Sequence, residues 1–316
     1  MGHALAASTK QTYASAQSLF FKFCISNTLL ADNGTPCPAS ELTILRFIGS
    51  LKDRRASTVR VYLSALRALH LRLGHADPLL NRPRIPMAIR GLRRVQDPQS
   101  TREKLPITSL ILYSLKLQLD TSTFDGCMLW AACCTAFFGF LRAAEFTVPP
   151  SGFDPRRHLS AASVTVSGLP IPSTVTLALR YSKTDQFGRG CSILLARSDS
   201  LLCPVMALMS YLRLRGGADG PLFHFASGSP LSRSRLSSQL RKLLSAAGFH
   251  GNYSLHSFRV GAATTAASLG FPDHLIKALG RWSSDAYRVY VKLPNVRLQQ
   301  ASVCLATTSS LPICIV

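Results

Sequence analysis

The sequence predicts a mainly α-helical protein of two domains, the second of which also contains a small antiparallel β-sheet. Three observations lead to this prediction. Apolar residues recur at helical spacing over most of the chain, one polar stretch lacks that spacing, and short β-branched runs gather in the second half. With 316 residues, of which 47% are hydrophobic, the chain is long enough for two domains with a sizeable buried core.

The predicted first domain covers residues 1–94 and is helical. Helices are expected in "STKQTYASAQSLFFKFC", "PASELTILRFIGSLKD" and "ASTVRVYLSALRALHLRLG". In the third stretch, apolar residues from Val59 to Leu73 recur at three- and four-residue steps, while Arg60 and Arg67 fall largely elsewhere on the helix. This pattern is typical of an amphipathic helix with a basic outer side. It supports contact with DNA only weakly, because a charged helix face is usually just solvated.

A linker is predicted at residues 95–107, where the sequence is polar, contains Pro98 and Pro106, and lacks apolar periodicity. The second domain, at residues 108–294, opens with helical patterns that extend to about Glu145. They include the apolar run "MLWAACCTAFFGFL". Its 14 residues are too few to cross a bilayer, which takes about 20, so the run is expected to form a buried helix.

The predicted sheet is built from the runs "SVTVS", "TVTLALRYSK" and "CSILLA", which are β-branched or apolar. The last two runs are separated by "TDQFGRG", which has the composition of a turn. A small antiparallel sheet that ends in a hairpin is therefore expected. Helices resume near "SLLCPVMALMSYLRLRGG" and continue to "NVRLQQASVCL".

Charge and cysteine content narrow the class of protein. Basic residues exceed acidic ones by 36 − 15 = 21, and the excess is spread along the chain. Such a balance favours a polyanionic partner, nucleic acid before a membrane surface. The N-terminal stretch lacks the apolar core of a secretory signal. The nine cysteines include no C-x-x-C pair and are expected to be free thiols in a reducing compartment, with neither disulfides nor a zinc site.

The stretch from Ser254 to Tyr290 places several polar side chains in an otherwise apolar region. His256 and Arg259 are three residues apart, a spacing that puts both on one face of a helix, and Ser254 is expected to cap the helix start. The small residues of "GAATTAAS" allow close packing, so we expect a buried helix whose polar pair points into a pocket. An isolated H-x-x-R is more often a core histidine beside a surface arginine.

Three further residues change that interpretation. Arg142 is expected at the C-terminal end of the apolar helix, where a guanidinium must leave the core or meet an anion. Glu145 can hold a neighbouring basic group in place, and Lys183 lies where a strand turns into "TDQFGRG". Each has a simple alternative as a helix-end charge or a solvated turn residue. Together they form a specific set with the later residues: Arg142, Lys183, His256, Arg259, Trp282 and Tyr290, in that order.

This set, with the stretch "HSFRVGAATTAASLGFPDHLIKALGRWSSDAYRVYV", resembles the catalytic domain of the tyrosine recombinase (phage integrase) family, and in particular its transposon-borne eukaryotic branch of DIRS, Ngaro and Crypton elements. The resemblance covers about residues 101–294, and the first domain is similar to the family's core-binding domain in layout only. It implies a site-specific DNA recombinase or integrase of a mobile element. Such an enzyme cuts and rejoins DNA through a covalent 3′-phosphotyrosyl intermediate.

The resemblance further implies a double-stranded DNA partner wrapped by the two domains, a synaptic homotetramer, a nuclear location and no membrane association. Residues 295–316, which end in the apolar "LPICIV", are then a candidate segment for docking on a neighbouring protomer.

The resemblance also implies a role for each residue of the set. Arginine suits phosphate because its planar fork donates two hydrogen bonds at once and stays charged. A phenol ionises near pH ~10 and needs help to act as a nucleophile. The implied roles are phosphate ligands for Arg142 and Arg259, a buttress for Glu145, the general acid for Lys183, a proton acceptor and phosphate ligand for His256, an indole N–H donor for Trp282, and the nucleophile for Tyr290.

The implied scheme requires neither a metal nor another cofactor, and the 15 acidic residues show no obvious cluster for a divalent ion. Two alternatives within the site stay open. Arg281 lies nine residues before Tyr290, where many relatives have histidine, although Trp282 is favoured as the donor. Tyr287 shares a helix face with Tyr290, which is favoured as the nucleophile by the "VKLP" that follows it. The rival functions are an inactive or domesticated DNA-binding protein and a type IB topoisomerase-like activity.

Overall fold

The computed structural model describes residues 7–96, 104–168, 170–182, 185, 188–289, 299 and 303. Within these residues the fold is mainly helical with one three-stranded antiparallel sheet, which confirms the predicted fold class. The chain divides into two compact units, Met1–Arg102 and Glu103–Val316, and each has its own hydrophobic core. The division falls within the stretch predicted to be a linker.

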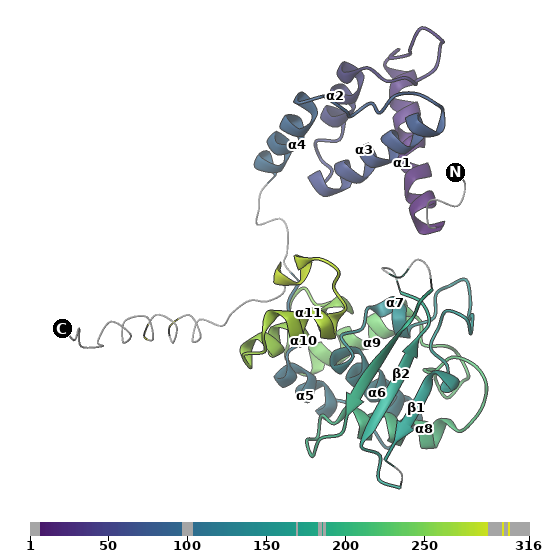
Figure 1. Cartoon of the computed structure of the whole chain (residues 1–316), viewed down its shortest axis with the longest axis vertical. Coiled ribbons are helices and arrows are strands. Elements are labelled where there is room, and N and C mark those ends of the chain that lie inside the picture. Colours follow the sequence, from purple (N-terminus) through teal and green to yellow (C-terminus); the bar gives the residue numbers. More distant parts are fainter. Residues whose placement is uncertain are drawn as a thin grey trace, which may run out of the picture. The chain divides into compact units, whose positions relative to one another are not determined.

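The described part of the first unit consists of four helices (Figure 1): α1 (Ala7–Ser26), α2 (Glu41–Ser50), α3 (Ala56–Arg72) and α4 (Arg84–Val95). Helix α1 packs against α3, and α2 packs against α4. The core contains Phe20, Phe47 and Leu66, all fully buried. Arg60 and Arg67 are exposed on α3, so this helix is amphipathic with a basic outer side, as its sequence pattern predicts.

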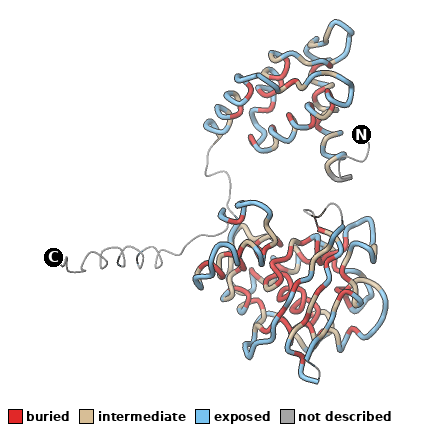
Figure 2. Tube along the Cα trace, in the orientation of Figure 1, coloured by how far each residue is buried: buried red, intermediate tan, exposed pale blue. Residues whose placement is uncertain are grey.

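The described part of the second unit combines seven α-helices with the sheet (Figure 1): α5 (Ser109–Leu117), α6 (Phe124–Phe138), α7 (Ala143–Phe146), α8 (Pro204–Arg215), α9 (Arg233–Ala246), α10 (His256–Ser268) and α11 (Asp273–Gly280). Every residue of α6 from Gly126 to Phe137 is buried, and this helix packs against α8 and α10. The apolar run therefore forms the buried helix that its composition predicts, and Figure 2 shows in red the buried residues of this unit.

The sheet consists of β1 (Val164–Ser167), β2 (Thr174–Leu179) and β3 (Cys191–Ala196), in that spatial order and antiparallel throughout. On β2, the buried Val175, Leu177 and Leu179 alternate with more exposed residues, because successive strand residues point to opposite faces. Ile193 pairs with Leu177 across the sheet and is buried on the same side. The sheet thus lays one apolar face on the helical core.

Helix α6 ends at Phe138, four residues before Arg142, so the prediction that Arg142 ends this helix is wrong. The N–H of Leu141 donates to the carbonyl of Ala136 at 2.9 Å, and Phe140 between them has a φ of 49°. This bond pattern closes a helix end through one residue in the left-handed region, a place that glycine usually takes. The chain then turns, and Arg142 becomes the N-cap residue of α7.

The start of α10 lies against the segment just after the unit boundary. The N–H of Ile107 donates to the carbonyl of Ser257 at 2.9 Å, and Ile107 is fully buried although it is the last residue of the predicted linker. A Cβ added to Gly261 would lie far inside the contact distance of the Ile107 carbonyl oxygen. Helix α10 can therefore approach this segment only because residue 261 has no side chain.

The seven cysteines among the described residues are free thiols, and six of them are buried: Cys24, Cys37, Cys127, Cys133, Cys134 and Cys203. Burial raises the pKa of the Cys133 thiol to about 12, and burial together with the charge of Cys37 raises the pKa of Cys24 to about 11. These thiols stay protonated at neutral pH and act as small apolar groups. Within the described ranges, no helix combines the length and apolar character that a membrane span requires.

The close approach at Gly261 gives a test of the fold. Gly261→Ala should lower the free energy of unfolding of the second unit by about 1–3 kcal/mol, because the new methyl group meets a backbone carbonyl that cannot rotate away. Gly49→Ala in α2 is the matched control, since a Cβ there meets nothing within 4 Å. Thermal unfolding followed by circular dichroism measures both variants. Equal stability of Gly261→Ala and the wild type would contradict the described packing of α10.

Candidate active site

Five of the seven residues to which the resemblance gives a role lie in the described part of the second unit. Arg142 is the N-cap residue of α7 and Glu145 lies within that helix. His256 and Arg259 belong to the first turn of α10, and Trp282 follows α11. Lys183 and Tyr290 lie outside the described residues.

The guanidinium of Arg259 is fixed in the interior, with 1% of the residue exposed. Its Nη1 donates to the carbonyl of Phe140 at 2.6 Å, and its Nη2 donates to the carbonyl of Gly280. Its Cζ lies 4.2 Å from the centroid of the Trp282 ring. The carbonyls and the indole face orient this cation, and neither of them carries a formal negative charge.

Glu145 is the acidic centre of the site, with 5% of the residue exposed. Its Oε1 accepts a hydrogen bond from Nη1 of Arg142 at 2.9 Å, and its Oε2 accepts one from the backbone N–H of Arg142 at the same distance. Oε2 also accepts from Nη2 of Arg281 at 3.0 Å. One buried carboxylate therefore holds two guanidinium groups that come from different parts of the chain.

Arg281 ties the end of α11 to the turn after α6. Its Nη1 donates to the carbonyl of Gly139 at 2.9 Å, and its Nη2 donates to that of Phe140 at 3.3 Å in addition to Glu145. The sequence suggested Arg281 only as an alternative phosphate donor and missed this role. Its backbone φ of 55° is uncommon for a residue with a side chain, and that could not be foreseen from the sequence.

The position of Trp282 depends on Gly280. A Cβ added to Gly280 would overlap the indole ring, so the ring can lie over this backbone only because the residue is glycine. The ring also packs edge-on against Phe140, with centroids 6.3 Å apart. The indole of Trp282 therefore contacts both Phe140 and the guanidinium of Arg259, and the choice between Trp282 and Arg281 as the additional donor stays a prediction.

Tyr287 is a packed core residue in the short 3-10 helix Asp285–Val289 and is 2% exposed. Its hydroxyl donates to Oδ2 of Asp273 at 3.0 Å, and its ring centroid lies 5.8 Å from that of Trp282. The hydroxyl is therefore occupied by a structural hydrogen bond.

The electrostatic environment of His256 is positive. Burial has the largest effect and lowers its pKa from the ordinary value, and the charges of Arg259, Lys104, Arg142 and Arg233 lower it further. At neutral pH the imidazole is therefore neutral and able to accept a proton.

The predicted cap of α10 by the Ser254 side chain is wrong. The helix begins at His256 after Leu255, and the Ser254 hydroxyl is buried without a hydrogen-bond partner. Instead, the backbone N–H of Ser254 donates to the Ser257 hydroxyl at 3.0 Å, and the N–H of Ser257 donates to the Ser254 carbonyl at 2.8 Å. The second serine of the turn thus stabilises the start of the helix.

Solved structures with the same fold are site-specific recombinases and integrases. A lambda integrase dimer bound to a COC′ core site is 17% identical with a TM-score of 0.60, over 92% of this chain and 73% of that one. The XerH recombinase bound to palindromic difH substrate is 14% identical with a TM-score of 0.64, over 92% and 78%. The Tn1549 transposon integrase in complex with circular intermediate DNA is 13% identical with a TM-score of 0.59, over 95% and 94%.

No protein-family model and no curated protein matches the sequence. The structural similarities show that the chain has the fold of the tyrosine recombinases. The narrower resemblance to the eukaryotic transposon branch stays a prediction.

The pKa of His256 provides a test of the electrostatics. We expect it below about 6.5, the ordinary value for histidine, and we expect Arg142→Gln and Arg233→Gln each to raise it. Arg213→Gln, which removes an exposed charge from α8, is the control and should leave it unchanged. NMR titration of the imidazole measures all four proteins, and a wild-type pKa at or above 6.5 would contradict the described environment.

The same shift links His256 to acid stability. As the pH falls below about 6.5, the unfolded chain binds a proton that the folded chain does not, so His256 makes unfolding easier in acid. The decrease in the free energy of unfolding stops growing once the pH is below the lowered pKa of His256 in the folded state. Arg233→Gln should make this decrease smaller.

Proposed function

We propose that this protein is a DNA recombinase that cuts and rejoins DNA through a covalent 3′-phosphotyrosyl intermediate. The observation that carries the proposal is that Arg142 and Arg259 are linked through Glu145, Arg281 and the Phe140 carbonyl on a tyrosine recombinase fold. His256 lies in the same helical turn as Arg259. Both arginines lie close enough to the imidazole to lower its pKa. Two guanidinium groups and a neutral base are what a phosphodiester needs for charge stabilisation and proton transfer.

The proposed reaction balances without an external reductant or energy source. The phenolate oxygen of Tyr290 attacks the phosphorus, the bond from phosphorus to the 5′ oxygen breaks, and the departing oxygen takes a proton from Lys183. Arg142 and Arg259 stabilise the negative charge on the non-bridging oxygens, and His256 takes up the phenol proton. Trp282 donates its indole N–H to the phosphate. Attack by a 5′-hydroxyl on the phosphotyrosine reverses these steps and reseals the strand.

Glu145 and Arg281 act on the reaction through other residues in this scheme. Glu145 holds the guanidinium of Arg142, and Arg281 holds both Glu145 and the Phe140 carbonyl to which Arg259 donates. They are therefore positioning residues for the two phosphate ligands.

The packing of Tyr287 supports Tyr290 as the nucleophile. Tyr287 would have to leave the core and break its hydrogen bond to Asp273 before its hydroxyl could reach a phosphate. Loss of a buried aromatic ring from the core costs several kcal/mol. The assignment of Tyr290 itself rests on the sequence resemblance.

The biological setting belongs to the same proposal. We infer a mobile-element integrase of the eukaryotic branch, a nuclear location, and a tetramer on synapsed DNA in which residues 295–316 dock on a neighbouring protomer. The sequence stretch that ends in "GRWSSDAYRVYV" supports the branch. Among the similar structures, a lambda integrase tetramer bound to a Holliday junction, 17% identical with a TM-score of 0.57, makes such an assembly reasonable for this fold.

Covalent trapping tests the proposed function. The purified protein is incubated, in the presence of a metal chelator, with a pool of nicked duplexes of randomised sequence. A short fragment beyond the nick diffuses away after cleavage, so a protein–DNA adduct that resists denaturant accumulates. We expect an adduct with the wild type and with Tyr287→Phe, and none with Tyr290→Phe, which should still bind DNA.

Two outcomes would contradict the proposal in different ways. An adduct that persists in Tyr290→Phe and vanishes in Tyr287→Phe would move the nucleophile to Tyr287. DNA binding without any adduct would favour a non-catalytic DNA-binding protein.

A further inference from the structure

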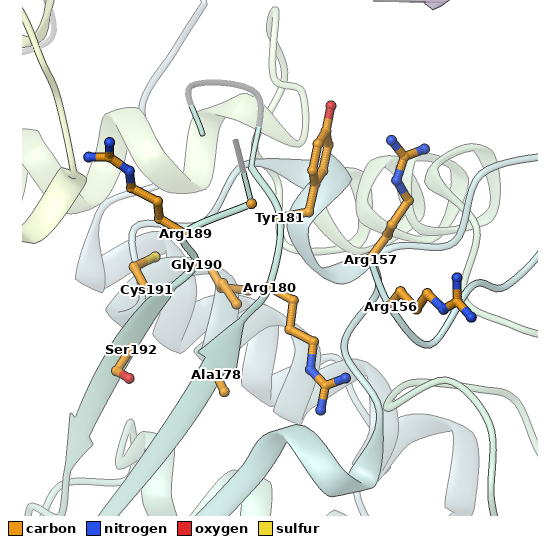
Figure 3. Close-up of a pocket in the computed structure, with 11 residues that line it drawn as sticks. Arg156, Arg157, Ala178, Arg180, Tyr181, Arg189, Gly190, Cys191 and Ser192 are labelled. Carbon is orange, nitrogen blue, oxygen red and sulfur yellow. The ribbon is translucent and has the colours of Figure 1, made fainter. Parts of the chain in front are cut away.

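An open hollow of about 610 Å³ lies at the ends of β2 and β3, and none of the described residues that line it belongs to the candidate site (Figure 3). The described residues that line it include four arginines and one tyrosine, and none of them is acidic: Arg156, Arg157, Arg180, Arg189 and Tyr181. Two of the arginines come from the turn after α7, and two come from the strand ends. Segments distant in the sequence thus bring like charges to one surface.

The carboxylates of Asp154 and Asp185, which are close in sequence to the residues that line the hollow, accept hydrogen bonds from backbone N–H groups. Oδ1 of Asp154 accepts a hydrogen bond from the N–H of Arg156 at 2.9 Å. The two carboxylate oxygens of Asp185 accept from the N–H groups of Arg189 and Gly190 at 3.0 and 2.6 Å. Within the part of the chain that the structure describes, no ion pair joins any of the four guanidinium groups to a carboxylate.

The arrangement of the four arginines suits an extended polyanion. Figure 3 shows that Arg189 and Arg157 lie on opposite sides of Tyr181 and that Arg180 points away from both, so the charges do not meet at one point. The guanidinium of Arg157 lies 4.7 Å from the centroid of the Tyr181 ring, which helps to hold it in place. A single small anion could reach only part of this set. Successive phosphates of a nucleic-acid strand can reach several of the arginines at once.

We propose that this hollow is a binding subsite for the sugar–phosphate backbone of duplex DNA, separate from the reacting phosphate. The inference rests on the proposed function, because that function supplies the DNA. Arg180 and Tyr181 precede Lys183 in the chain, and Arg189 follows it. A DNA strand bound here is therefore held by both flanks of the segment that carries the proposed general acid.

The salt dependence of DNA binding tests the subsite. Binding of a 30-base-pair duplex of arbitrary sequence is measured by fluorescence anisotropy at several salt concentrations. Each lost phosphate contact should lower the slope of log affinity against log salt by about 0.9, so the double variant R157Q/R189Q should lose about 1.8. The double variant R213Q/R241Q, which removes two exposed arginines from α8 and α9, is the charge-matched control.

A second measurement identifies the ligand groups. Single phosphates of the duplex are replaced by neutral methylphosphonates, and those that weaken wild-type binding are located. In R157Q/R189Q, one or two of these replacements should lose their effect, because the contact is already absent. Three outcomes would overturn the subsite. The effects of the methylphosphonates and of R157Q/R189Q on affinity could simply add, or the two double variants could have equal salt slopes. The third is that poly-glutamate displaces the duplex as effectively as DNA does.

These results are independent of the covalent trapping experiment. If the slope and methylphosphonate effects appear but the wild type forms no adduct, the subsite stands and the proposed reaction fails. If the wild type forms an adduct and R157Q/R189Q binds like R213Q/R241Q, the reaction stands and the subsite fails.

Discussion

The buried carboxylate of Glu145 is the interaction on which the candidate site depends. A buried charge costs several kcal/mol unless it is paired and hydrogen-bonded, and the two oxygens of Glu145 accept three hydrogen bonds from Arg142 and Arg281. Removal of this carboxylate would leave two partly buried guanidinium groups without their shared partner. The positions of α7 and of the end of α11 are thereby linked through a single side chain.

The turn between α6 and α7 extends this constraint to α10. Its carbonyls at Gly139 and Phe140 accept from Arg281, and the Phe140 carbonyl also accepts from Arg259. A helix that continued through Phe140 would use these carbonyls in its own hydrogen bonds and would point them elsewhere. The early end of α6 therefore supplies the acceptors that orient the buried arginine of the site.

The sequence predicted the elements of the fold well because apolar periodicity records which face each element buries. The buried helix α6, the amphipathic α3 and the antiparallel strands all follow from that pattern. No separate start was predicted for α4, although its sequence "RIPMAIRGLRRV" is amphipathic, with Ile85 and Ile89 buried and its four arginines exposed.

The details that failed are those set by tertiary contacts. The end of α6 uses Phe140 in a left-handed conformation, which no residue preference suggests. The hydrogen bonds of Arg281 reach residues about 140 positions away in the sequence, so no local pattern could reveal them. The residue types of the candidate site could be proposed from the sequence resemblance, because phosphate chemistry restricts them. Among the residues that hold them in place, Glu145 was predicted as a buttress, whereas the role of Arg281 could not be foreseen.

A double-mutant cycle between Glu145 and Arg281 tests most directly the claim that this carboxylate organises the site. Both tryptophans belong to the second unit, so their fluorescence during urea unfolding reports on that unit alone. Glu145→Gln, Arg281→Gln and the double variant are compared with the wild type. We predict a coupling free energy of about 1–3 kcal/mol, with each single variant nearly as unstable as the double. Losses that add to within about 0.5 kcal/mol would contradict the account.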